Sequence, residues 1–329
     1  MKVNFIINNC LDHTNVDREG CGASELLFYN TLLSLSKFYK IDVYNHSNKI
    51  CLENIEYRDY SSFNENLGDT TIVQRYFDKL INLHKQSPNN KYILWSHDFL
   101  ENGYITLQGE YSLEYINSYF KTNGIKTVAV SNFHKNNIKS KFPDIEIVVI
   151  YNALFPSIFP KIPNVVKKNE ITFASNWAKG LENVLNIMKE YYKRDPTIKL
   201  NLLKPSYCEM QPDFKDYPFI NVIGTIRDKR EYSRLISQSI CVVTTSYAET
   251  FGCIFAESLH LGTPVVADLN VSAGFHEFVE ERYRVNFKNC HEVIELIESI
   301  KNNNPVVDLP PQFYETEIID QWKTLINFK

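Results

Sequence analysis

The sequence predicts an α/β protein built from two parallel-sheet domains. Short apolar, β-rich runs alternate with helical patterns along almost the whole 329-residue chain. Continuous apolar strands separated by helices are typical of parallel sheets covered on both faces. The alternation stops once, in the segment Phe155–Val166 with its three prolines, and then restarts. A length of 329 residues also corresponds to about two domains of ordinary size.

The same alternation gives the individual elements of each half. In the first half the predicted strands are 3–7, 41–45, 91–97, 126–131 and 146–152, with helices at 22–39 and 132–142. In the second half the predicted strands are 170–175, 198–203, 219–224, 240–246 and 264–268, with helices at 180–194, 229–237, 252–262 and 312–328. We expect one domain at 1–158, joined by the last helix at 312–329, and a second domain at 159–311.

The composition is that of a globular protein, with 44% hydrophobic and 22% charged residues. A formal net charge of −4 gives no electrostatic case for nucleic-acid binding. The opening run MKVNFIINNC is too short for a signal peptide, and no stretch approaches the roughly 20 apolar residues of a membrane span. We therefore expect a soluble, cytoplasmic protein. The seven cysteines form no CxxC pair, which argues against a disulfide framework and against a structural zinc site.

Two glutamates, Glu249 and Glu257, follow the predicted strand 240–246. Ligands of parallel sheets bind at the carboxyl ends of the strands. An eight-residue spacing corresponds to about 12 Å along a helix, so the two carboxylates cannot share one proton or one metal ion. They can hold the two ends of an elongated ligand. The alternative is that Glu249 is a helix-start acid favoured by the helix dipole and Glu257 lies on a solvated helix face.

Between the two glutamates, the amides of Phe251, Gly252 and Cys253 form the predicted start of a helix. Free amides at a helix N-terminus make an anion site. The order of carboxylate, anion site and carboxylate suits a nucleotide-sugar, in which a diphosphate lies between a sugar and a ribose.

Residues that follow other strands extend this site. Lys179 stands just before the helix 180–194, where it can reach a diphosphate as a point charge or serve as an ordinary surface lysine. Gly20 and Gly22 stand at the start of helix 22–39, where backbone can approach phosphate closely. A third glycine in register is missing, so the dinucleotide-binding fingerprint is absent and a dehydrogenase is disfavoured. His97 ends a strand and is a candidate for holding a sugar or acceptor hydroxyl, or a structural histidine.

These residues together resemble the retaining GT-B glycosyltransferases of family 4, the "glycosyl transferases group 1" type. The segment E-T-F-G-C-I-F-A-E-S-L-H-L-G-T-P-V-V-A, residues 249–267, is similar to the family's E-x7-E block and the strand after it. K-G-L at 179–181 resembles its diphosphate-binding loop, and G-C-G-A-S-E-L-L its glycine-rich helix start. The implied fold is GT-B, two Rossmann-like domains with parallel sheets facing each other across a cleft.

The resemblance also implies roles. Glu249 would contact the hydroxyls of the donor sugar, Glu257 the ribose, and Lys179 the diphosphate. Gly22 would close over the diphosphate, Phe251, Gly252, Cys253 and Ile254 would supply backbone donors, and His97 would line the sugar pocket. The reaction would be hexosyl transfer of the EC 2.4 type from a UDP- or GDP-sugar to a hydroxyl of a glycan, lipid or small molecule. It would retain anomeric configuration and need no bound metal or other cofactor.

One departure from the family keeps alternatives open. Asn176 stands near the position of the arginine that usually precedes the loop lysine. A nucleotide-sugar epimerase on the same fold and a catalytically silent sugar-binding protein are therefore the alternatives. The predicted helix 132–142 carries four lysine or histidine cations, which raises the alternatives of a peripheral membrane contact or an ordinary solvated helix. The oligomeric state is not predicted.

Overall fold

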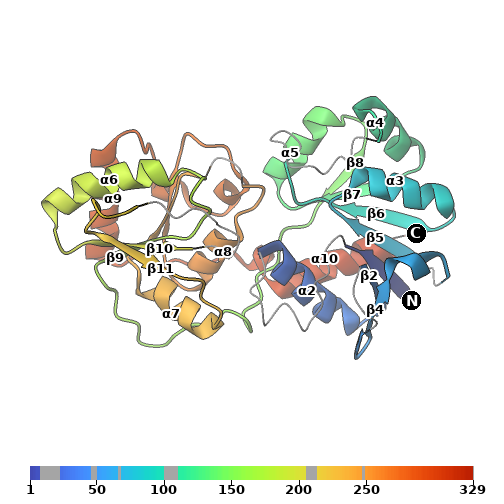
Figure 1. Ribbon diagram of the computed structural model, residues 1–329, viewed down its shortest axis with the longest axis horizontal. Helices are drawn as coiled ribbons and strands as arrows, with labels where there is room; N and C mark the ends of the chain where they lie inside the picture. Colours follow the sequence, from blue (N-terminus) through green and yellow to red (C-terminus); the bar gives the residue numbers. More distant parts are fainter. Residues whose placement is uncertain are drawn as a thin grey trace. The chain divides into compact units, whose positions relative to one another are not determined.

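The computed structural model describes residues 1–7, 23–45, 50–65, 68–99, 110–204, 213–246 and 249–328 (Figure 1). The chain divides into two compact units. Unit 1 comprises Met1–Ala153 with Glu315–Lys329, and unit 2 comprises Leu154–Tyr314. The sequence predicted the domain boundaries after residues 158 and 311, whereas the two units meet after residues 153 and 314. Each unit is a sheet covered by helices.

The described strands of unit 1 form one sheet in the order β3-β4-β2-β1-β5-β6-β7-β8. Only β3 and β4 are antiparallel neighbours; the other pairs are parallel. The strands are β1 (Lys2–Ile6), β2 (Lys40–Asn45), β3 (Ile50–Leu52), β4 (Ile55–Asp59), β5 (Thr70–Gln74), β6 (Lys91–Trp95), β7 (Lys126–Ala129) and β8 (Glu146–Val149). The chain moves outward from β1 to β2 and then returns to β5 on the other side of β1. The carboxyl ends of β1 and β5 are therefore the topological switch point, where ligands of such sheets bind.

Helices cover both faces of this sheet (Figure 1). On one face lie α3 (Phe77–Gln86), α4 (Leu113–Thr122) and α5 (Asn132–Lys141), and on the other lie α2 (Ala23–Ser36) and α10 (Glu315–Asn327). Phe77 of α3 is fully buried, with its ring 5.4 Å from that of Phe120 and 4.9 Å from that of Phe142. This aromatic cluster holds the three helices on their face of the sheet.

The sheet of unit 2 has the order β11-β10-β9-β12-β13-β14, with all neighbours parallel. The strands are β9 (Glu170–Phe173), β10 (Lys199–Leu203), β11 (Ile220–Ile223), β12 (Val242–Thr244), β13 (Val265–Asp268) and β14 (Arg284–Val285). The helices are α6 (Leu181–Arg194), α7 (Lys229–Gln238), α8 (Cys253–His260) and α9 (Cys290–Asn303). Helices α6 and α9 share one face and α7 lies on the other (Figure 1). Here the switch point lies at the carboxyl ends of β9 and β12.

The proline-rich segment Phe155–Val166, where the predicted alternation stops, belongs to unit 2. The amide of Leu154 donates to the carbonyl of Phe313 at 2.8 Å. Phe159 is buried, and its carbonyl lies 3.0 Å from Nε2 of His260. Prolines keep this segment out of helices and sheet, but its aromatic side chains still join the core.

The last helix, α10, completes unit 1. Trp322 is buried, and its ring lies 4.8 Å from that of Trp95 in β6. The ammonium of Lys91 donates to the carbonyls of Leu325 and Ile326, at 2.8 and 3.2 Å, and so satisfies acceptors that a helix C-terminus leaves free. These contacts explain why the end of the chain belongs to the same unit as its beginning.

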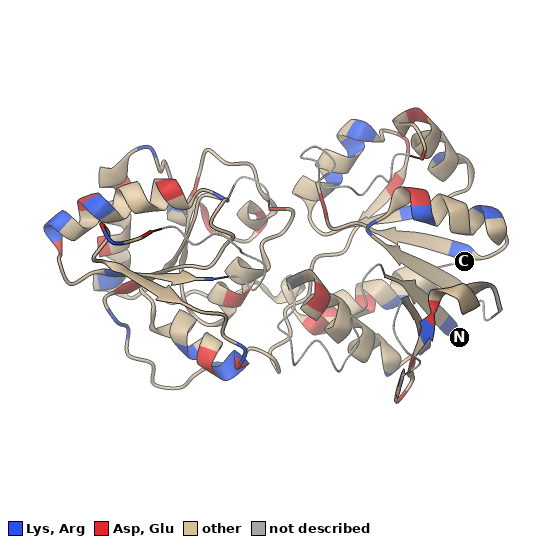
Figure 2. Ribbon diagram, in the orientation of Figure 1, with Lys and Arg blue, Asp and Glu red and all other residues tan. Residues whose placement is uncertain are grey.

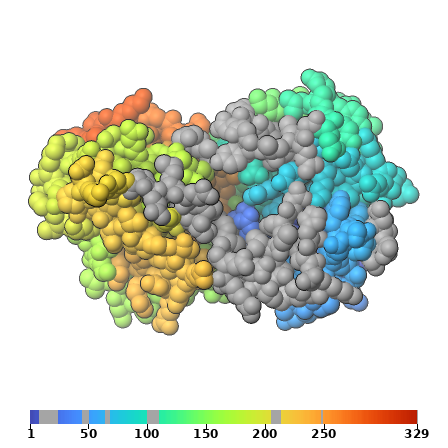
Figure 3. Space-filling view, in the orientation of Figure 1, coloured from blue at the N-terminus to red at the C-terminus, as the bar shows by residue number. Residues whose placement is uncertain are grey.

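Charged residues of both signs are interspersed on the helices of each unit (Figure 2). In the space-filling view, α7 (yellow) and α4 (green) form exposed parts of the surfaces of their units (Figure 3). No described helix is long and apolar enough to cross a membrane.

The cationic helix predicted at 132–142 is α5. The prediction that all four of its lysine and histidine side chains are surface cations is wrong for His134. His134 is fully buried: its Nδ1 accepts from the amide of Val130 at 3.3 Å, and its Nε2 donates to the carbonyl of Asp98 at 3.1 Å. Burial lowers the pKa of His134 to about 4, so the ring is neutral at pH 7. The ammonium of Lys139 turns back to the carbonyls of Pro143 and Ile145. The cationic surface of α5 is therefore smaller than its sequence suggests.

We expect the buried His134 to make the protein sensitive to mild acid. Its pKa is about 4 in the folded state against 6.5 for the free side chain, so the unfolded chain takes up a proton first as pH falls. The stability present above pH 6.5 is then lost toward pH 4, by about 3 kcal/mol from this group. Urea unfolding at pH 7, 6 and 5 should give a shallower pH slope for His134→Gln than for the wild type. Equal slopes would contradict this assignment.

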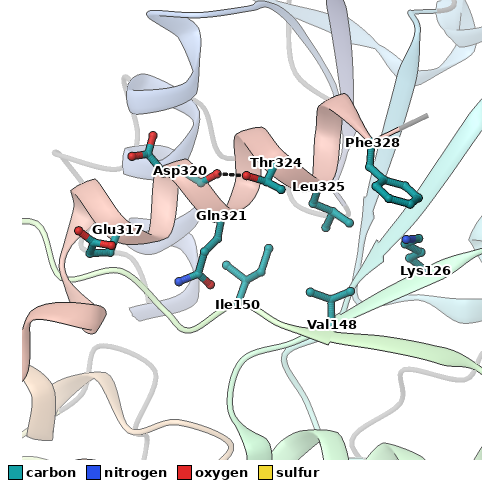
Figure 4. Close-up of a pocket in the computed structure, with 9 residues that line it drawn as sticks. All are labelled: Lys126, Val148, Ile150, Glu317, Asp320, Gln321, Thr324, Leu325 and Phe328. Atoms are coloured by element: carbon teal, nitrogen blue, oxygen red, sulfur yellow. Dashed lines mark hydrogen bonds between the residues drawn. The ribbon is translucent and has the colours of Figure 1, made fainter.

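A cavity of about 420 Å³ lies beside α10 in unit 1 (Figure 4). Its apolar walls are Val148, Ile150, Leu325 and Phe328, and its polar rim includes Glu317 and Asp320 of α10. None of the predicted site residues lines it.

Candidate functional site

The switch point of unit 2 brings together two residues singled out from the sequence. Lys179 lies in the segment after β9, and Glu249 lies in the segment after β12. The Lys179 ammonium is 2.8 Å from Oε1 of Glu249, and the two side chains are 24% and 20% exposed. The pair is thus held within the protein but open to a ligand at the edge where parallel sheets bind their ligands.

A tight turn before α6 presents Lys179. Oδ1 of Asn176 accepts from the amide of Ala178 at 2.9 Å, and the carbonyl of Asn176 accepts from the amide of Lys179 at 2.8 Å. Such a side-chain turn is typical of asparagine. Asn176, which departs from the family pattern, therefore shapes the loop that carries the lysine.

Gly180 closes this loop onto the neighbouring strand end. Its φ of 89° is in the left-handed region that glycine favours, and it is the N-cap of α6. The hydroxyl of Thr245 donates to the carbonyl of Gly180 at 2.7 Å. A Cβ at Gly180 would lie 2.1 Å from Oγ1 of Thr245. The Thr245 side chain, after β12, is therefore in direct contact with the backbone of Gly180, after β9, and this contact joins the two segments that carry Lys179 and Glu249.

Glu249 is held from two sides. The hydroxyl of Ser246 donates to its Oε1 at 3.0 Å, and its carbonyl accepts from the amide of Gly274 at 2.9 Å. Oε1 thus receives both the Ser246 hydroxyl and the Lys179 ammonium. Ser246 and Thr245 were not among the residues predicted from the sequence. Their position directly after a buried strand was the available signal.

The start of α8 follows Glu249. Gly252 is its N-cap, with φ 89° and ψ 67°, and its carbonyl accepts from the amide of Phe255 at 3.0 Å. The amides of Cys253 and Ile254 therefore precede the first hydrogen bond within the helix. Phe251 lies outside the helix, with its side chain buried and its ring 5.1 Å from that of Phe278. The backbone donors predicted at Phe251, Gly252, Cys253 and Ile254 therefore stay a prediction.

Glu257 lies on α8 with a different partner from Glu249. It is half-buried, and its Oε2 accepts from the hydroxyl of Tyr232, on α7, at 2.5 Å. Burial raises the pKa of Glu257, while the Tyr232 hydrogen bond and the charge of Lys229 oppose that rise. Glu257 therefore does not lie on a solvated helix face, which was the alternative to a role in ligand binding.

The remaining predicted residues belong to unit 1. His97 follows β6, is buried, and has its ring 4.8 Å from that of Trp95. Burial, then the charges of Arg75 and His134, lower the pKa of His97 well below its usual value, so the ring is neutral. Gly22 lies outside the described residues.

Arg75, at the switch point of unit 1, was missed from the sequence. It follows β5 with a φ of 74°, and the amide of Tyr76 donates to the carbonyl of Gln74 at 3.0 Å. This is the pattern of the classic γ-turn, which is rare and strained. Nε of Arg75 lies 3.3 Å from Oδ2 of Asp98, and its Nη2 donates to the hydroxyl of Ser24 at 2.9 Å. Strained backbone of this kind clusters at functional sites.

We expect the backbone strain at Arg75 to make a glycine variant more stable than an alanine variant, the reverse of their usual order of stability. Arg75→Gly relieves a conformation worth about 1–3 kcal/mol, whereas Arg75→Ala keeps it, and both lose the Asp98 ion pair. The glycine variant should therefore be the more stable of the two by about 1 kcal/mol or more in urea unfolding. An alanine variant as stable as the glycine variant would show that this turn is unstrained.

No group of three or more histidine, cysteine, aspartate or glutamate side chains able to hold a metal ion occurs among the residues that the structure describes.

Comparison with known proteins identifies the fold. No protein-family model matches the chain, and no curated protein matches it. Solved structures do match. Sucrose-phosphate synthase from Thermosynechococcus elongatus superposes with a TM-score of 0.73 at 13% identity, covering 98% of each chain. The chain has the GT-B fold.

Two further GT-B structures agree over the full length. WaaG, a glycosyltransferase involved in lipopolysaccharide biosynthesis, has a TM-score of 0.62 at 10% identity, covering 99% of this chain and 100% of its own. An E. coli trehalose-6-phosphate structure bound with UDP-2-fluoro glucose has a TM-score of 0.67 at 11% identity, covering 99% and 96%. The predicted α/β fold with two parallel-sheet domains is confirmed, while membership of family 4 stays a prediction.

Proposed function

We propose that this GT-B protein is a glycosyltransferase that moves a sugar from a nucleotide-diphosphate sugar to an acceptor hydroxyl. The observation that carries the proposal is the Lys179–Glu249 pair beside the start of α8, at the switch point of unit 2. The site offers a positive charge, backbone amides and carboxylates, which match the diphosphate and the hydroxyl groups of such a donor. UDP in a structural neighbour supports a nucleotide-sugar donor.

In this proposal each residue has one task. Lys179 and the amides of Cys253 and Ile254 bind the diphosphate. Glu249 accepts hydrogen bonds from hydroxyls of the donor sugar and, in the free protein, keeps Lys179 in place through the 2.8 Å ion pair. Glu257 accepts a hydrogen bond from the ribose. The roles that the resemblance gives to His97, at the sugar pocket, and to Gly22, at the diphosphate, stay predictions.

The chemistry follows from where charge develops. Cleavage of the bond from sugar to diphosphate leaves negative charge on the diphosphate and an oxocarbenium-like sugar. Fixed donors aimed at the leaving oxygen stabilise that state more than the ground state. We propose that the sugar keeps its anomeric configuration, that the leaving phosphate takes the acceptor proton, and that Lys179 and the helix dipole replace a bound metal.

The test is product analysis with a panel of UDP-, GDP-, ADP- and dTDP-sugars, in the presence of EDTA. A transferase releases nucleoside diphosphate from one donor, and NMR of the transferred sugar gives the anomeric outcome. An epimerase instead returns an altered nucleotide-sugar with the diphosphate intact. A silent binding protein is stabilised against heat by a donor and releases nothing.

A further inference from the structure

The partner of Glu257 was not expected from the sequence. Tyr232 lies in the first turn of α7, and its hydroxyl reaches α8 to meet Oε2 of Glu257 at 2.5 Å. Burial raises the pKa of Tyr232 well above its usual value, so the phenol stays protonated and acts as the donor.

The surroundings fix the tyrosine ring. Tyr232 is buried, and its ring lies 5.8 Å from that of Phe159. The ammonium of Lys229 sits 5.4 Å from the Phe159 ring and 5.6 Å from the Tyr232 ring. Helix α7 is itself anchored by its N-cap, because Asp228 accepts from the amides of Arg230 and Glu231. A ring packed in this way has little freedom, so its hydroxyl holds Oε2 in one place.

The other oxygen of Glu257 is in a different situation. No described residue donates a hydrogen bond to Oε1. Oε1 is also absent from the fully buried side-chain atoms that lack a hydrogen-bond partner, so it is not completely buried. Oε1 therefore reaches solvent while Oε2 is occupied. A carboxylate oriented in this way presents one defined acceptor to a ligand.

We propose that Tyr232 is a positioning residue that fixes Glu257 so that Oε1 accepts a hydrogen bond from one ribose hydroxyl of the bound nucleotide. This inference rests on the proposed function and adds a determinant of nucleotide specificity to it. A ribose that lacks the hydroxyl would leave Oε1 without its partner, and a hydrogen bond to a charged group is worth about tenfold or more in affinity.

The experiment separates positioning from general stability. Dissociation constants are measured by calorimetry for uridine and guanosine diphosphates, each in ribo, 2′-deoxy and 3′-deoxy form. The variants are Tyr232→Phe and, as the matched control, Tyr191→Phe. Tyr191 is a buried tyrosine of α6 whose hydroxyl has no hydrogen-bond partner among the described residues. Glu257→Gln, alone and combined with Tyr232→Phe, provides a second route if one variant folds poorly.

The wild type should bind a ribo form about tenfold or more tighter than one of its deoxy forms. Tyr232→Phe should reduce this ratio by weakening only the ribo form, and Tyr191→Phe should leave it unchanged. In the Glu257→Gln background, Tyr232→Phe should change the ratio no further.

Three results would overturn the inference: a wild-type ratio near one, a ratio unchanged in Tyr232→Phe, or equal weakening of all forms by that variant. If the wild type binds none of the six diphosphates, this inference falls together with UDP- and GDP-sugars as donors, while the release assay with ADP- and dTDP-sugars still decides the proposed function. If the diphosphates bind and only the ratio fails, the proposed function stands.

Discussion

Replacing Lys179 by methionine should lower kcat/KM for the nucleotide-sugar by about 100- to 1000-fold. Methionine keeps the length of the side chain but removes the charge that we place at the leaving diphosphate. The fold should be little affected, because a partly exposed ion pair contributes only about 0–1 kcal/mol. Initial rates of nucleoside diphosphate release, with the melting temperature of the same preparation, measure both effects.

Lys193→Met is the matched control for this loss. Lys193 also pairs with a glutamate, Glu190, at 2.6 Å, but both side chains are exposed on α6. Its replacement should leave kcat/KM within about twofold of the wild type. If Lys179→Met and Lys193→Met retain the same activity, the charge of Lys179 has no role in the reaction.

Gly180→Ala should be the most damaging single substitution in the donor loop. The left-handed conformation costs an alanine about 1–2 kcal/mol, and its Cβ would lie 2.1 Å from Oγ1 and 3.0 Å from the carbonyl oxygen of Thr245. Relieving that overlap requires the loops after β9 and β12 to separate, at about 1–3 kcal/mol more. We expect a loss of about 3 kcal/mol in the free energy of unfolding, measured in urea, together with a strong loss of activity.

Gly262→Ala distinguishes the clash from the backbone conformation. Gly262 has a φ of 76°, but a Cβ there would meet nothing within 4 Å. It should cost only the conformational part, about 1–2 kcal/mol, and leave activity intact. Equal losses for the two variants would mean that the contact between Gly180 and Thr245 is unimportant.

Much of the fold could be predicted because buried parallel strands have a strong apolar signature. Val3–Ile7 and the strands of unit 2 carry that signature, and their elements are present in the structure. The short strands β3, β4 and β14, the strand β5 and the helices α3, α4 and α9 were not singled out. β3 spans only three residues, Ile50–Leu52, too few for a periodic pattern to emerge.

Part of the candidate site could be predicted because the predicted strands show which residues follow a strand end. Lys179 and Glu249 each follow a strand, and strand ends of one parallel sheet meet at one edge. Tyr232 could not be found in this way, because it lies in the helix K-R-E-Y-S-R-L-I-S, where it is indistinguishable from a core residue. Its contact with Glu257 joins residues 25 positions apart on two helices. Arg75 was missed because a γ-turn centred on arginine has no composition signal, unlike turns built on glycine.

The most direct test of the account is nucleotide release from UDP-, GDP-, ADP- and dTDP-sugars by the wild type, Lys179→Ala and Glu249→Ala, without added metal. We expect slow release of nucleoside diphosphate from one donor by the wild type and loss of that release in both variants. Release that persists in both variants, or a wild type that neither cleaves nor is thermally stabilised by any donor, would contradict the placement of a donor site at Lys179 and Glu249.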